Sequence, residues 1–179
     1  MSEAKLIENM RQLGEGIQAC LDKKLYTSAL ILIYSAIDIT GWLASTNPKA
    51  KVRKRFTNWV DSYLLSAKEL GCTSLELYSA RCGLVHTFTP DSKIVESEKV
   101  RRIAYAWGEK KSSDLQKLIE KTGWSDRLVA VRVEDLYEAW RLGLVMFIHE
   151  LKDNQKRAEV VYTRASKFYD QIIEGTKRV

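Results

Sequence analysis

Apolar residues recur with helical spacing along most of this chain. Between residues 3 and 23 they return every three or four positions, which is typical of an amphipathic helix with one face against a core. Residues 25–46 are apolar on nearly all sides, so we expect a central helix that neighbours cover on most sides. The same reasoning predicts further helices at residues 49–65, from 74 to the residues before Pro90, from 134 to 151, and at about 154–173.

The middle of the chain has a different pattern. Residues 102–107 and 128–133 alternate between apolar and polar positions, which predicts two short, half-buried strands. Between them, residues 112–121 suit a helix that Ser113 caps. The arrangement we expect is an antiparallel pair of strands around this helix, within a mixed insertion that spans about residues 95–133.

Local signals place several helix ends. Pro48 suits the first turn of the helix at residues 49–65, and Gly71 is expected to end that helix. Ser74 is a good cap for the next helix, with Glu76 close behind it.

The composition fits one globular domain that covers residues 1–179. Apolar residues make up 45% of the chain and charged residues 29%, which is typical of a folded protein. Nine Gly and two Pro disfavour a loop-rich all-β fold. We therefore predict a mainly α fold, an up-and-down helical bundle with a small two-stranded β insertion. Three cysteines without a C-x-x-C pair indicate neither a disulfide framework nor a zinc knuckle, so we expect a cytoplasmic protein.

The apolar stretch at residues 25–44 has two interpretations. Its length would suit a membrane span, but Asp38 lies near its centre, and a span would have to hold that charge in lipid. The favoured interpretation is therefore a buried core helix and not a membrane span, and we expect no membrane among the partners of this chain. The N-terminus has no basic segment followed by an apolar run, so the sequence predicts no signal peptide.

The formal net charge of +6 favours anionic partners such as nucleic acid. Five basic side chains are crowded into residues 49–55, and they are Lys49, Lys51, Arg53, Lys54 and Arg55. Such a run can follow the phosphate backbone of RNA, or it can be the solvated face of a helix. The five tryptophans can stack bases, but their apolar neighbours favour core positions for most of them.

The chain has two histidines, the side chains that most readily move protons near neutral pH. His149 lies on the apolar stripe of a long helix, where a packed histidine is the more common outcome. His86 follows Arg81 near the end of a helix, and such a pair can hold a phosphodiester and move its protons. No cluster of His, Cys or carboxylate residues has metal-ligand spacing, so we expect neither a metal nor another cofactor.

Asp38 is the one charged residue in the apolar stretch at residues 25–44. A buried carboxylate needs a partner, and Arg81 on a neighbouring apolar helix is the obvious candidate. Tyr34 lies one turn earlier on the same face as Asp38. The pair is either a structural ion pair between two helices or the support of a functional site that contains Arg81.

Two of these segments carry a resemblance to a known family. Residues 34–38 read Tyr-Ser-Ala-Ile-Asp, and residues 79–87 read Ser-Ala-Arg-Cys-Gly-Leu-Val-His-Thr. Together with the helical pattern they resemble the HEPN superfamily, most strongly its bacterial members of unassigned role. The resemblance covers about residues 5–90 and extends loosely to the C-terminal helices. The family signature R-x(4–6)-H is matched by Arg81 and His86.

The resemblance implies a specific chemistry. In active members of the family the Arg–His pair comes from both protomers of a homodimer and forms a metal-independent ribonuclease site. Arg81 would then hold the phosphate of a single-stranded RNA, and His86 would act as general acid or base. The products would be a 2′,3′-cyclic phosphate and a 5′-hydroxyl. Asp38 and Tyr34 would support the site, and Cys82 stands where the family usually has Asn, Asp or His.

The resemblance also implies partners, namely RNA, a second copy of the chain and, in a toxin or phage-defence role, an antitoxin protein. The family contains inactive members that bind RNA or a partner protein, so catalysis does not follow from the resemblance. Three functions stay open from the sequence. They are a ribonuclease, a non-catalytic binding module, and a structural interaction protein in which Arg81, Asp38 and His86 form only a buried polar network.

Overall fold

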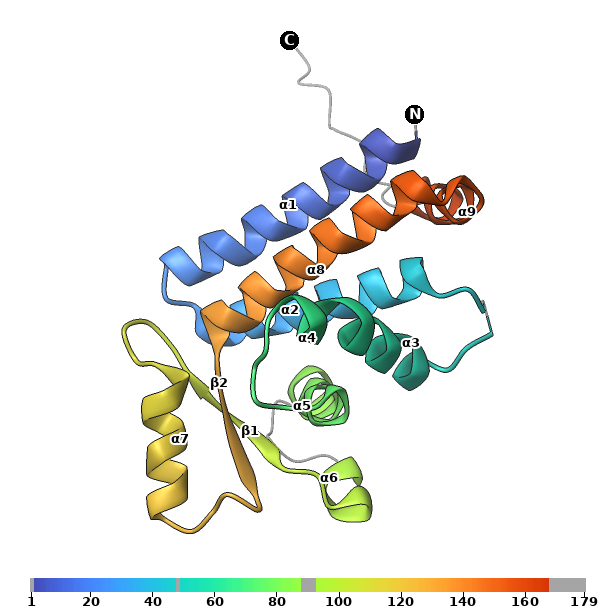
Figure 1. The fold of residues 1–179 in the computed structure, drawn as a ribbon. Coiled ribbons are helices and arrows are strands. Elements are labelled where there is room, and N and C mark those ends of the chain that lie inside the picture. Colours follow the sequence, from blue (N-terminus) through green and yellow to red (C-terminus); the bar gives the residue numbers. More distant parts are fainter. Residues whose placement is uncertain (1, 48, 88–92, 168–179) are drawn as a thin grey trace.

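The computed structural model describes residues 2–47, 49–87 and 93–167, which form a helical bundle with a small β-α-β unit against one side (Figure 1). The mainly helical fold with a two-stranded sheet agrees with the sequence prediction. The elements are α1 (Ser2–Asp22), α2 (Tyr26–Ala44), α3 (Val52–Trp59), η1 (Val60–Leu64), α4 (Leu65–Ala67), α5 (Ser74–Thr87), α6 (Lys93–Glu98), β1 (Arg102–Ala106), α7 (Ser112–Lys121), β2 (Leu128–Arg132), α8 (Val133–Asp153) and α9 (Gln155–Ala165). The helix predicted to reach residue 173 is therefore followed only to Ala165, and residues 168–173 lie outside the described part.

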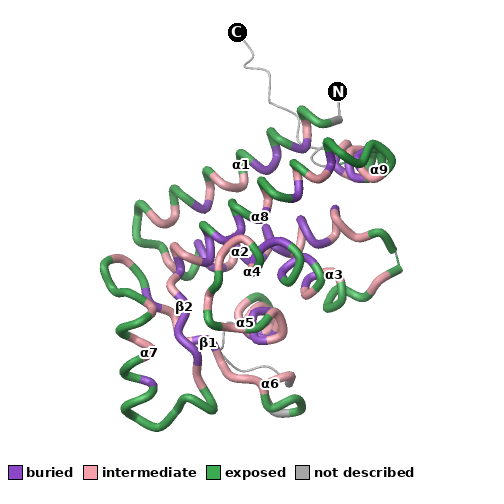
Figure 2. The backbone as a smooth tube through the Cα atoms, in the orientation of Figure 1, coloured by how far each residue is buried: buried purple, intermediate pink, exposed green. Residues whose placement is uncertain are grey.

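α2 is the central helix of the bundle, as its apolar pattern predicts. It packs against α1, α3 and α8, and only Thr27 and Ser28 are exposed along it. By contrast, burial alternates along α1 and α8, whose outer faces are open to solvent (Figure 2). Within the described residues, α2 is the one helix whose length and composition would allow it to cross a membrane, and half of that stretch is buried inside the protein.

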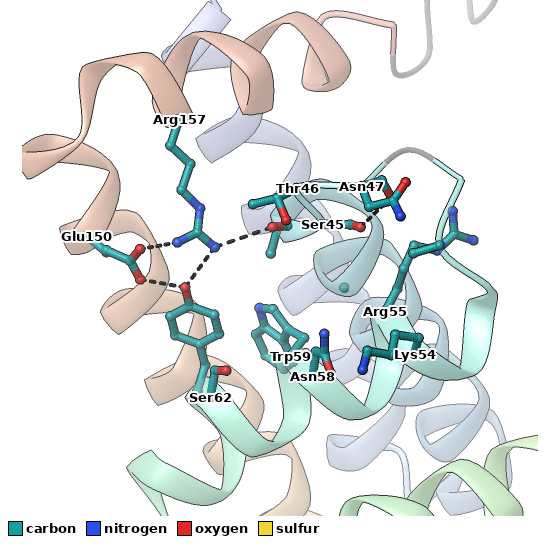
Figure 3. A pocket seen from close by; sticks show the side chains of 14 residues that line it. Ser45, Thr46, Asn47, Lys54, Arg55, Asn58, Trp59, Ser62, Glu150 and Arg157 are labelled. Carbon is teal, nitrogen blue, oxygen red and sulfur yellow. Dashed lines mark hydrogen bonds and ion pairs between the residues drawn. The ribbon is translucent and has the colours of Figure 1, made fainter.

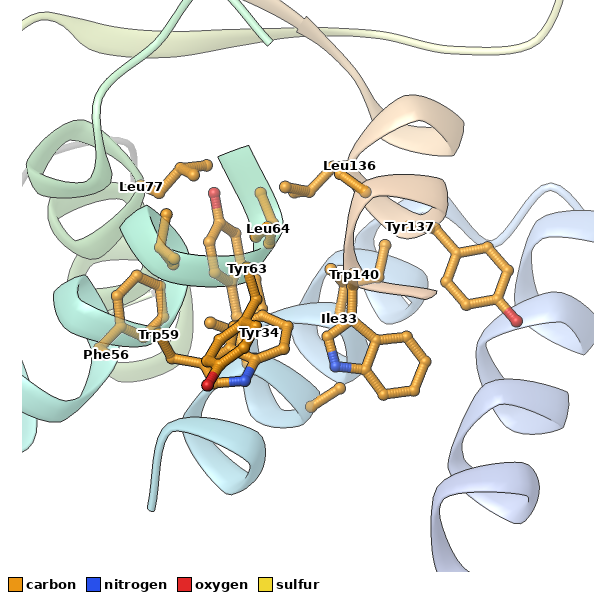
Figure 4. Close-up of a cluster of buried hydrophobic side chains, with 14 of the residues drawn as sticks. Ile33, Tyr34, Phe56, Trp59, Tyr63, Leu64, Leu77, Leu136, Tyr137 and Trp140 are labelled. Atoms are coloured by element: carbon orange, nitrogen blue, oxygen red, sulfur yellow. The ribbon is translucent and has the colours of Figure 1, made fainter. Parts of the chain in front are cut away.

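Aromatic side chains join α2 to its neighbours (Figure 4). Phe56 of α3 lies between Tyr34 of α2 and Tyr78 of α5, with ring centroids 6.5 Å and 5.4 Å away. Tyr63 of η1 meets the ring of Phe147 in α8 edge-on at 5.4 Å. A fully buried side chain of this size contributes about 1.5–3 kcal/mol to stability. This set of rings therefore fixes the positions of α3 and η1, which carry much of the candidate site.

The helix predicted at residues 49–65 starts late and contains a π-helical turn, η1. Lys51 has an extended backbone, so α3 begins after it, while Pro48 lies outside the described residues. The π-helical turn faces α8 at Gly143, where a Cβ atom would lie 3.0 Å from the carbonyl carbon of Tyr63. A glycine at this point therefore lets α8 approach the widened turn.

Thr73, and not Ser74, caps α5. The hydroxyl of Thr73 accepts the N–H of Glu76 at 3.2 Å, and the Glu76 carboxylate accepts the N–H of Thr73 at 2.8 Å. This reciprocal pair is a capping box. The prediction for Ser113 is also wrong, because the residue before α7 is Lys111. A capping residue needs a non-helical backbone, and both predicted serines already lie within their helices.

β1 and β2 run parallel, so the predicted antiparallel pairing is wrong. Arg102 pairs with Leu128 at one end of the register, and Ala106 pairs with Arg132 at the other. An antiparallel pair can be closed by a tight turn, whereas a parallel pair needs a crossover, which α7 supplies here. α7 packs on both strands, β1 also contacts α5, and β2 contacts α8 (Figure 1). The insertion is thus a β-α-β unit seated on the bundle.

Two polar contacts fasten this unit to the bundle. The hydroxyl of the fully buried Tyr34 in α2 is hydrogen-bonded to the hydroxyl of Tyr105 in β1. Just before β1, Arg101 binds the buried Glu76 through Nε and Nη2, at 2.6 Å and 3.2 Å from the two carboxylate oxygens. Burial opposes the charge on Glu76, but the bond to Arg101 outweighs it and lowers the pKa of the carboxyl.

Candidate functional site

The structure forms the ion pair that the sequence predicts between Asp38 and Arg81. α2 supplies Asp38 and α5 supplies Arg81, whose Nε donates to Oδ2 at 2.7 Å. The side chains of Arg81 and Asp38 are 15% and 22% exposed. Burial opposes the charge on the guanidinium, but Asp38 outweighs that effect and raises the pKa of Arg81. The guanidinium of Arg81 is therefore held in its charged form, and the pair joins the two helices.

The two other predicted residues on α5 are placed differently. His86 lies in the last turn of α5, and its side chain lies outside the described part of the structure. Cys82 is partly buried beside Tyr78. Burial first, and then the nearby Cys82, raise the pKa of the Tyr78 hydroxyl. Cys82 thus lies in the packed layer between α5 and its neighbours.

Tyr34, the second predicted supporting residue on α2, is fully buried. Burial, followed by the contact with Tyr105, raises the pKa of Tyr34 well above its usual value, so the hydroxyl stays protonated. Its contact with β1 serves to hold the β-α-β unit on the bundle. A ligand that approaches from solvent does not reach this side chain.

The predicted basic run divides between two faces of α3. Arg53 holds Glu98 in a bidentate contact. Its Nη1 donates to Oε1 at 2.5 Å and its Nη2 donates to Oε2 at 2.6 Å. The hydrogen bond to Glu98 raises the pKa of Arg53, and Tyr78 and Cys82 of α5 add smaller electrostatic contributions, which agrees with the packing of α3 against α5. One member of the run therefore lies next to the turn of α5 that carries Arg81.

The rest of the run lies away from α5. Lys49 and Lys51 are exposed in the connection that leads into α3. Lys54 and Arg55 line a pocket of about 530 Å³ on the opposite side of the helix. The structure thus brings Arg53 toward Arg81 and Asp38 but does not bring the whole run to them.

This pocket is a feature that the sequence did not reveal (Figure 3). It opens between the C-terminal end of α2, residues 45–47 and Ala50 that follow it, α3, η1 and the α8–α9 corner. In Figure 3, Lys54 and Arg55 lie on one side of it and Arg157 on the other, with the ring of Trp59 between them. Gly41 forms part of its floor, where a Cβ atom would lie 2.9 Å from the carbonyl oxygen of Arg55.

A hydrogen-bonded network lines one wall of the pocket. Arg157 forms an ion pair with Glu150, and its Nη2 donates to the Tyr63 hydroxyl at 3.0 Å and to the Ala44 carbonyl at 3.3 Å. The Tyr63 hydroxyl in turn donates to Glu150. Burial and the bond to Glu150 raise the pKa of Tyr63 to about 12, so this hydroxyl remains a donor. The guanidinium of Arg157 also lies 5.7 Å from the ring centroid of Phe147.

Sequence reasoning missed this network because its members are far apart in the chain. Tyr63 and Ala44 lie in the first half of the sequence, and Glu150 and Arg157 lie on either side of the break between α8 and α9. An i, i+7 Glu–Arg pair across a helix break carries no signal of its own. The π-helical turn positions Tyr63 in this network, but it has no sequence signature, so it could not have pointed to the network in advance.

The tryptophans divide between core and surface. Trp59 and Trp140 are 1% exposed, as predicted for core residues, whereas Trp107 and Trp124 are about half exposed, at 51% and 55%. Both exposed tryptophans belong to the β-α-β unit, where the sheet is too small to cover them. Trp42 is partly buried and lies under the guanidinium of Arg164.

Several exposed apolar side chains of the described residues lie on the neighbouring helices α1 and α8, which are away from α5 (Figure 1). It consists of Ile7, Leu142, Val145 and Met146. α5 packs instead on α2, α3 and β1. An interface built on the α1–α8 face would therefore leave the Arg81 residues of two copies apart.

Comparison of this chain with protein-family models, with curated proteins and with solved structures finds no match. Among the described residues, no three His, Cys, Asp or Glu side chains come together in a group that could hold a metal ion.

Proposed function

We propose that this chain is a cytoplasmic, HEPN-like RNA-binding protein that cleaves single-stranded RNA without a metal, through Arg81 and His86 at the seam of a homodimer. The observation that supports this most is the ion pair between Arg81 and Asp38. It holds an arginine in a fixed place on the helix that carries His86 in its last turn. A toxin or phage-defence role, with an antitoxin protein as a partner, belongs to the same proposal.

In this proposal Asp38 is a positioning residue. Its contact with Nε holds one edge of the guanidinium and favours the charged form of Arg81. A guanidinium fixed in this way can stabilise charge that develops on the non-bridging oxygens of a phosphate during cleavage. His86 would remove the proton from the ribose 2′-hydroxyl or donate one to the departing 5′-oxygen. The bond from the 2′-oxygen to phosphorus forms as the bond to the 5′-oxygen breaks, which leaves a cyclic phosphate.

The basic run supplies a route for the RNA toward α5. Lys51 is exposed and has no ion pair within the described part of the chain, so it is free to contact phosphates. Arg53 lies on the helix that packs against α5, and an RNA phosphate there would replace its present partner Glu98. These two cations lie at the start of α3, and the fold places that helix next to α5.

Cleavage in EDTA tests the catalytic proposal, and the chain supplies its own control. Wild type should cut a fluorescent single-stranded RNA, His86→Ala should lose activity by about 100-fold or more, and His149→Ala should retain it. His149 is the only other histidine, and its side chain is 76% exposed on α8. Circular dichroism must show the same helicity for all three proteins. Equal activity of the two variants would contradict a role for His86.

The homodimer is tested separately. A site formed by two protomers requires α5 at the interface, so Val85→Asp, at a residue 38% exposed on α5, should convert the dimer to a monomer. Val145→Asp, at a residue 64% exposed on α8, should leave the dimer intact. Light scattering after size exclusion measures the mass of each. Dissociation by Val145→Asp alone would place the interface on the α1–α8 face and contradict a shared site.

A non-catalytic RNA-binding module is the second candidate. The observation that favours it is the cover over Arg81, which is only 15% exposed and already engaged by Asp38. In that case wild type would bind RNA without cutting it, and affinity would fall steeply between about 50 and 200 mM salt. Lys51→Gln would weaken binding, whereas His86→Ala would not change it. Fluorescence anisotropy with the same RNA distinguishes this outcome from cleavage.

A further inference from the structure

The pocket between the end of α2, α3, η1 and the α8–α9 corner carries charges and hydrogen-bond donors that the proposed ribonuclease does not use (Figure 3). We propose that this pocket binds a phosphomonoester of a small hydroxylated molecule, which in chemical class is a sugar phosphate. The inference stands on the geometry of the pocket and does not depend on the chemistry at Arg81.

The charge of the pocket favours a dianion. Its lining contains three cations, Lys54, Arg55 and Arg157, and one carboxylate, Glu150. Arg157 already neutralises Glu150. Lys54 and Arg55 have no ion pair with any described residue, so two positive charges remain uncompensated. A phosphomonoester near neutral pH carries nearly two negative charges and matches this excess.

Two buried donors at the pocket have no hydrogen-bond partner among the residues that the structure describes. Nε1 of Trp59 is unpaired although the residue is 1% exposed, and Nε of Arg157 is also buried and unpaired. In Figure 3 the indole nitrogen lies on the edge of the Trp59 ring that is turned toward Thr46 and Arg157. Buried N–H groups in native proteins nearly always have an acceptor. Both nitrogens have almost no accessible surface, so a ligand oxygen accepts from them only when a neighbouring side chain of the pocket moves aside as the ligand binds.

The remaining lining indicates what carries the phosphate. Thr46, Asn58 and Ser62 offer hydroxyl and amide groups without a side-chain hydrogen bond inside the described structure, which suits a body rich in hydroxyls. The rings of Trp59 and Tyr63 are 1% and 7% exposed, so neither offers an open face for a base. The pocket volume of about 530 Å³ is also larger than a bare phosphate ion needs. These features favour a sugar phosphate over a nucleotide and over inorganic phosphate.

Nuclear magnetic resonance of the tryptophan indoles tests the site directly, because the chain has five tryptophans. Trp59→Phe identifies the Trp59 signal in the full-length protein. Addition of ribose 5-phosphate should shift that signal, while the signal of Trp140, the other buried unpaired indole, should stay in place. Ribose alone should shift neither. No shift of the Trp59 signal at about 10 mM ribose 5-phosphate, roughly ten times a millimolar Kd, would overturn the proposal.

Matched charge variants then separate the pocket from general positive charge. In calorimetric titrations with ribose 5-phosphate, Lys54→Gln and Arg55→Gln should each weaken binding about tenfold, or about 1.4 kcal/mol. Lys51→Gln removes the same charge from the same run but outside the pocket, and should change Kd by less than about twofold. Equal losses for Lys51→Gln and Lys54→Gln would overturn the proposal.

Further titrations define the source of the phosphate. A 5′-phosphorylated oligoribonucleotide carries the same ribose phosphate at its end. If it binds more tightly than its 5′-hydroxyl counterpart, and Lys54→Gln removes that preference, the pocket would be assigned to RNA ends. Binding of free ribose 5-phosphate alone would assign it to a metabolite. Tighter binding of adenosine 5′-monophosphate than of ribose 5-phosphate, or of a dicarboxylate than of either, would contradict the ligand class.

Discussion

Arg81 and Arg157 both engage the central helix α2, but at different points and in different surroundings. Arg81 meets Asp38 along the length of α2, and both side chains are largely covered. Arg157 meets the C-terminal end of α2 at the Ala44 carbonyl, shares Glu150 with Tyr63, and borders an open pocket. We call the first the closed pair and the second the open network. The same residue types thus form a helix-to-helix ion pair in one place and one wall of a pocket in the other.

The difference follows from what surrounds each arginine. The closed pair lies where α2 and α5 pack against each other and against α3, so these helices cover most of both side chains. The open network lies where α2 has ended and the residues that follow turn away before α3 begins. A helix end leaves carbonyl groups without helical partners, which gives cations something to bind and leaves room beside them. Polar networks at helix ends are therefore better placed to take a ligand than those between helices.

The largest effect that we expect comes from breaking the closed pair. Asp38→Ala leaves the charge of Arg81 without its carboxylate and should reduce the free energy of unfolding by about 3 kcal/mol, the lower end for a buried pair. Glu150→Ala in the open network should lose about 1 kcal/mol, because its side chain is 41% exposed. Urea denaturation of both variants makes the comparison. Equal losses would mean that the two networks are energetically alike.

The next effect comes from the close helix contact beneath the pocket. Gly41→Ala places a Cβ atom 2.9 Å from the Arg55 carbonyl oxygen and should destabilise the protein by about 1–3 kcal/mol through overpacking. Gly16→Ala is the control, because its Cβ would meet only a side-chain carbon of Leu32 at 3.9 Å. That variant should be neutral or gain up to about 1 kcal/mol in helix propensity. Thermal unfolding that shows Gly41→Ala as stable as Gly16→Ala would contradict the close contact.

A smaller effect should appear at alkaline pH in the open network. The pKa of Tyr63 is raised to about 12 in the folded protein, so its contribution to stability is fully present below the unfolded value of about 10. That contribution is lost as pH rises from about 10 through 12, because the unfolded chain releases the proton more readily. Tyr63→Phe should therefore lose less stability than wild type over this range. Parallel slopes for the two proteins in melting temperature against pH would contradict the raised pKa.

The smallest expected effect concerns the pocket cations. Lys54→Gln and Lys51→Gln should each change the free energy of unfolding by less than about 0.5 kcal/mol, because neither side chain holds an ion pair in the described structure. Together with the binding titrations, this result would show that Lys54 serves a ligand and not the fold. A loss above about 1 kcal/mol for Lys54→Gln alone would show instead that Lys54 has a structural role.

Sequence patterns predicted the elements better than their boundaries and relative directions. The alternating pattern of residues 102–107 and 128–133 correctly identified two strands, but a half-buried strand has the same alternation in a parallel and an antiparallel pair. The direction is set by the crossover through α7, which is a tertiary matter. Likewise Ser74 looked like a cap, yet the backbone turns one residue earlier, at Thr73.

The candidate site shows the same division. The sequence correctly predicted Arg81 as the partner of Asp38. A single charge in an apolar stretch is costly to bury without an opposite charge, and few residues could supply one. The sequence predicted that the whole basic run at residues 49–55 binds RNA together. Successive side chains of α3, however, point toward different neighbours. Arg53 therefore faces α5, while Lys54 and Arg55 face the pocket. The position of the His86 side chain lies outside the described residues, so its role stays a prediction.

The sequence by itself determined that α2 is the central helix, because apolar surface on all sides of a helix is costly to leave in water. It also determined that the single carboxylate of α2 takes an arginine, because a charge in the core is costly without a partner. Only the tertiary structure decided the parallel strands, the π-helical turn against Gly143 and the pocket beneath Arg157. These features arise where residues from both halves of the chain meet. Local periodicity records which face of a helix is buried, but it does not record which distant segment buries it.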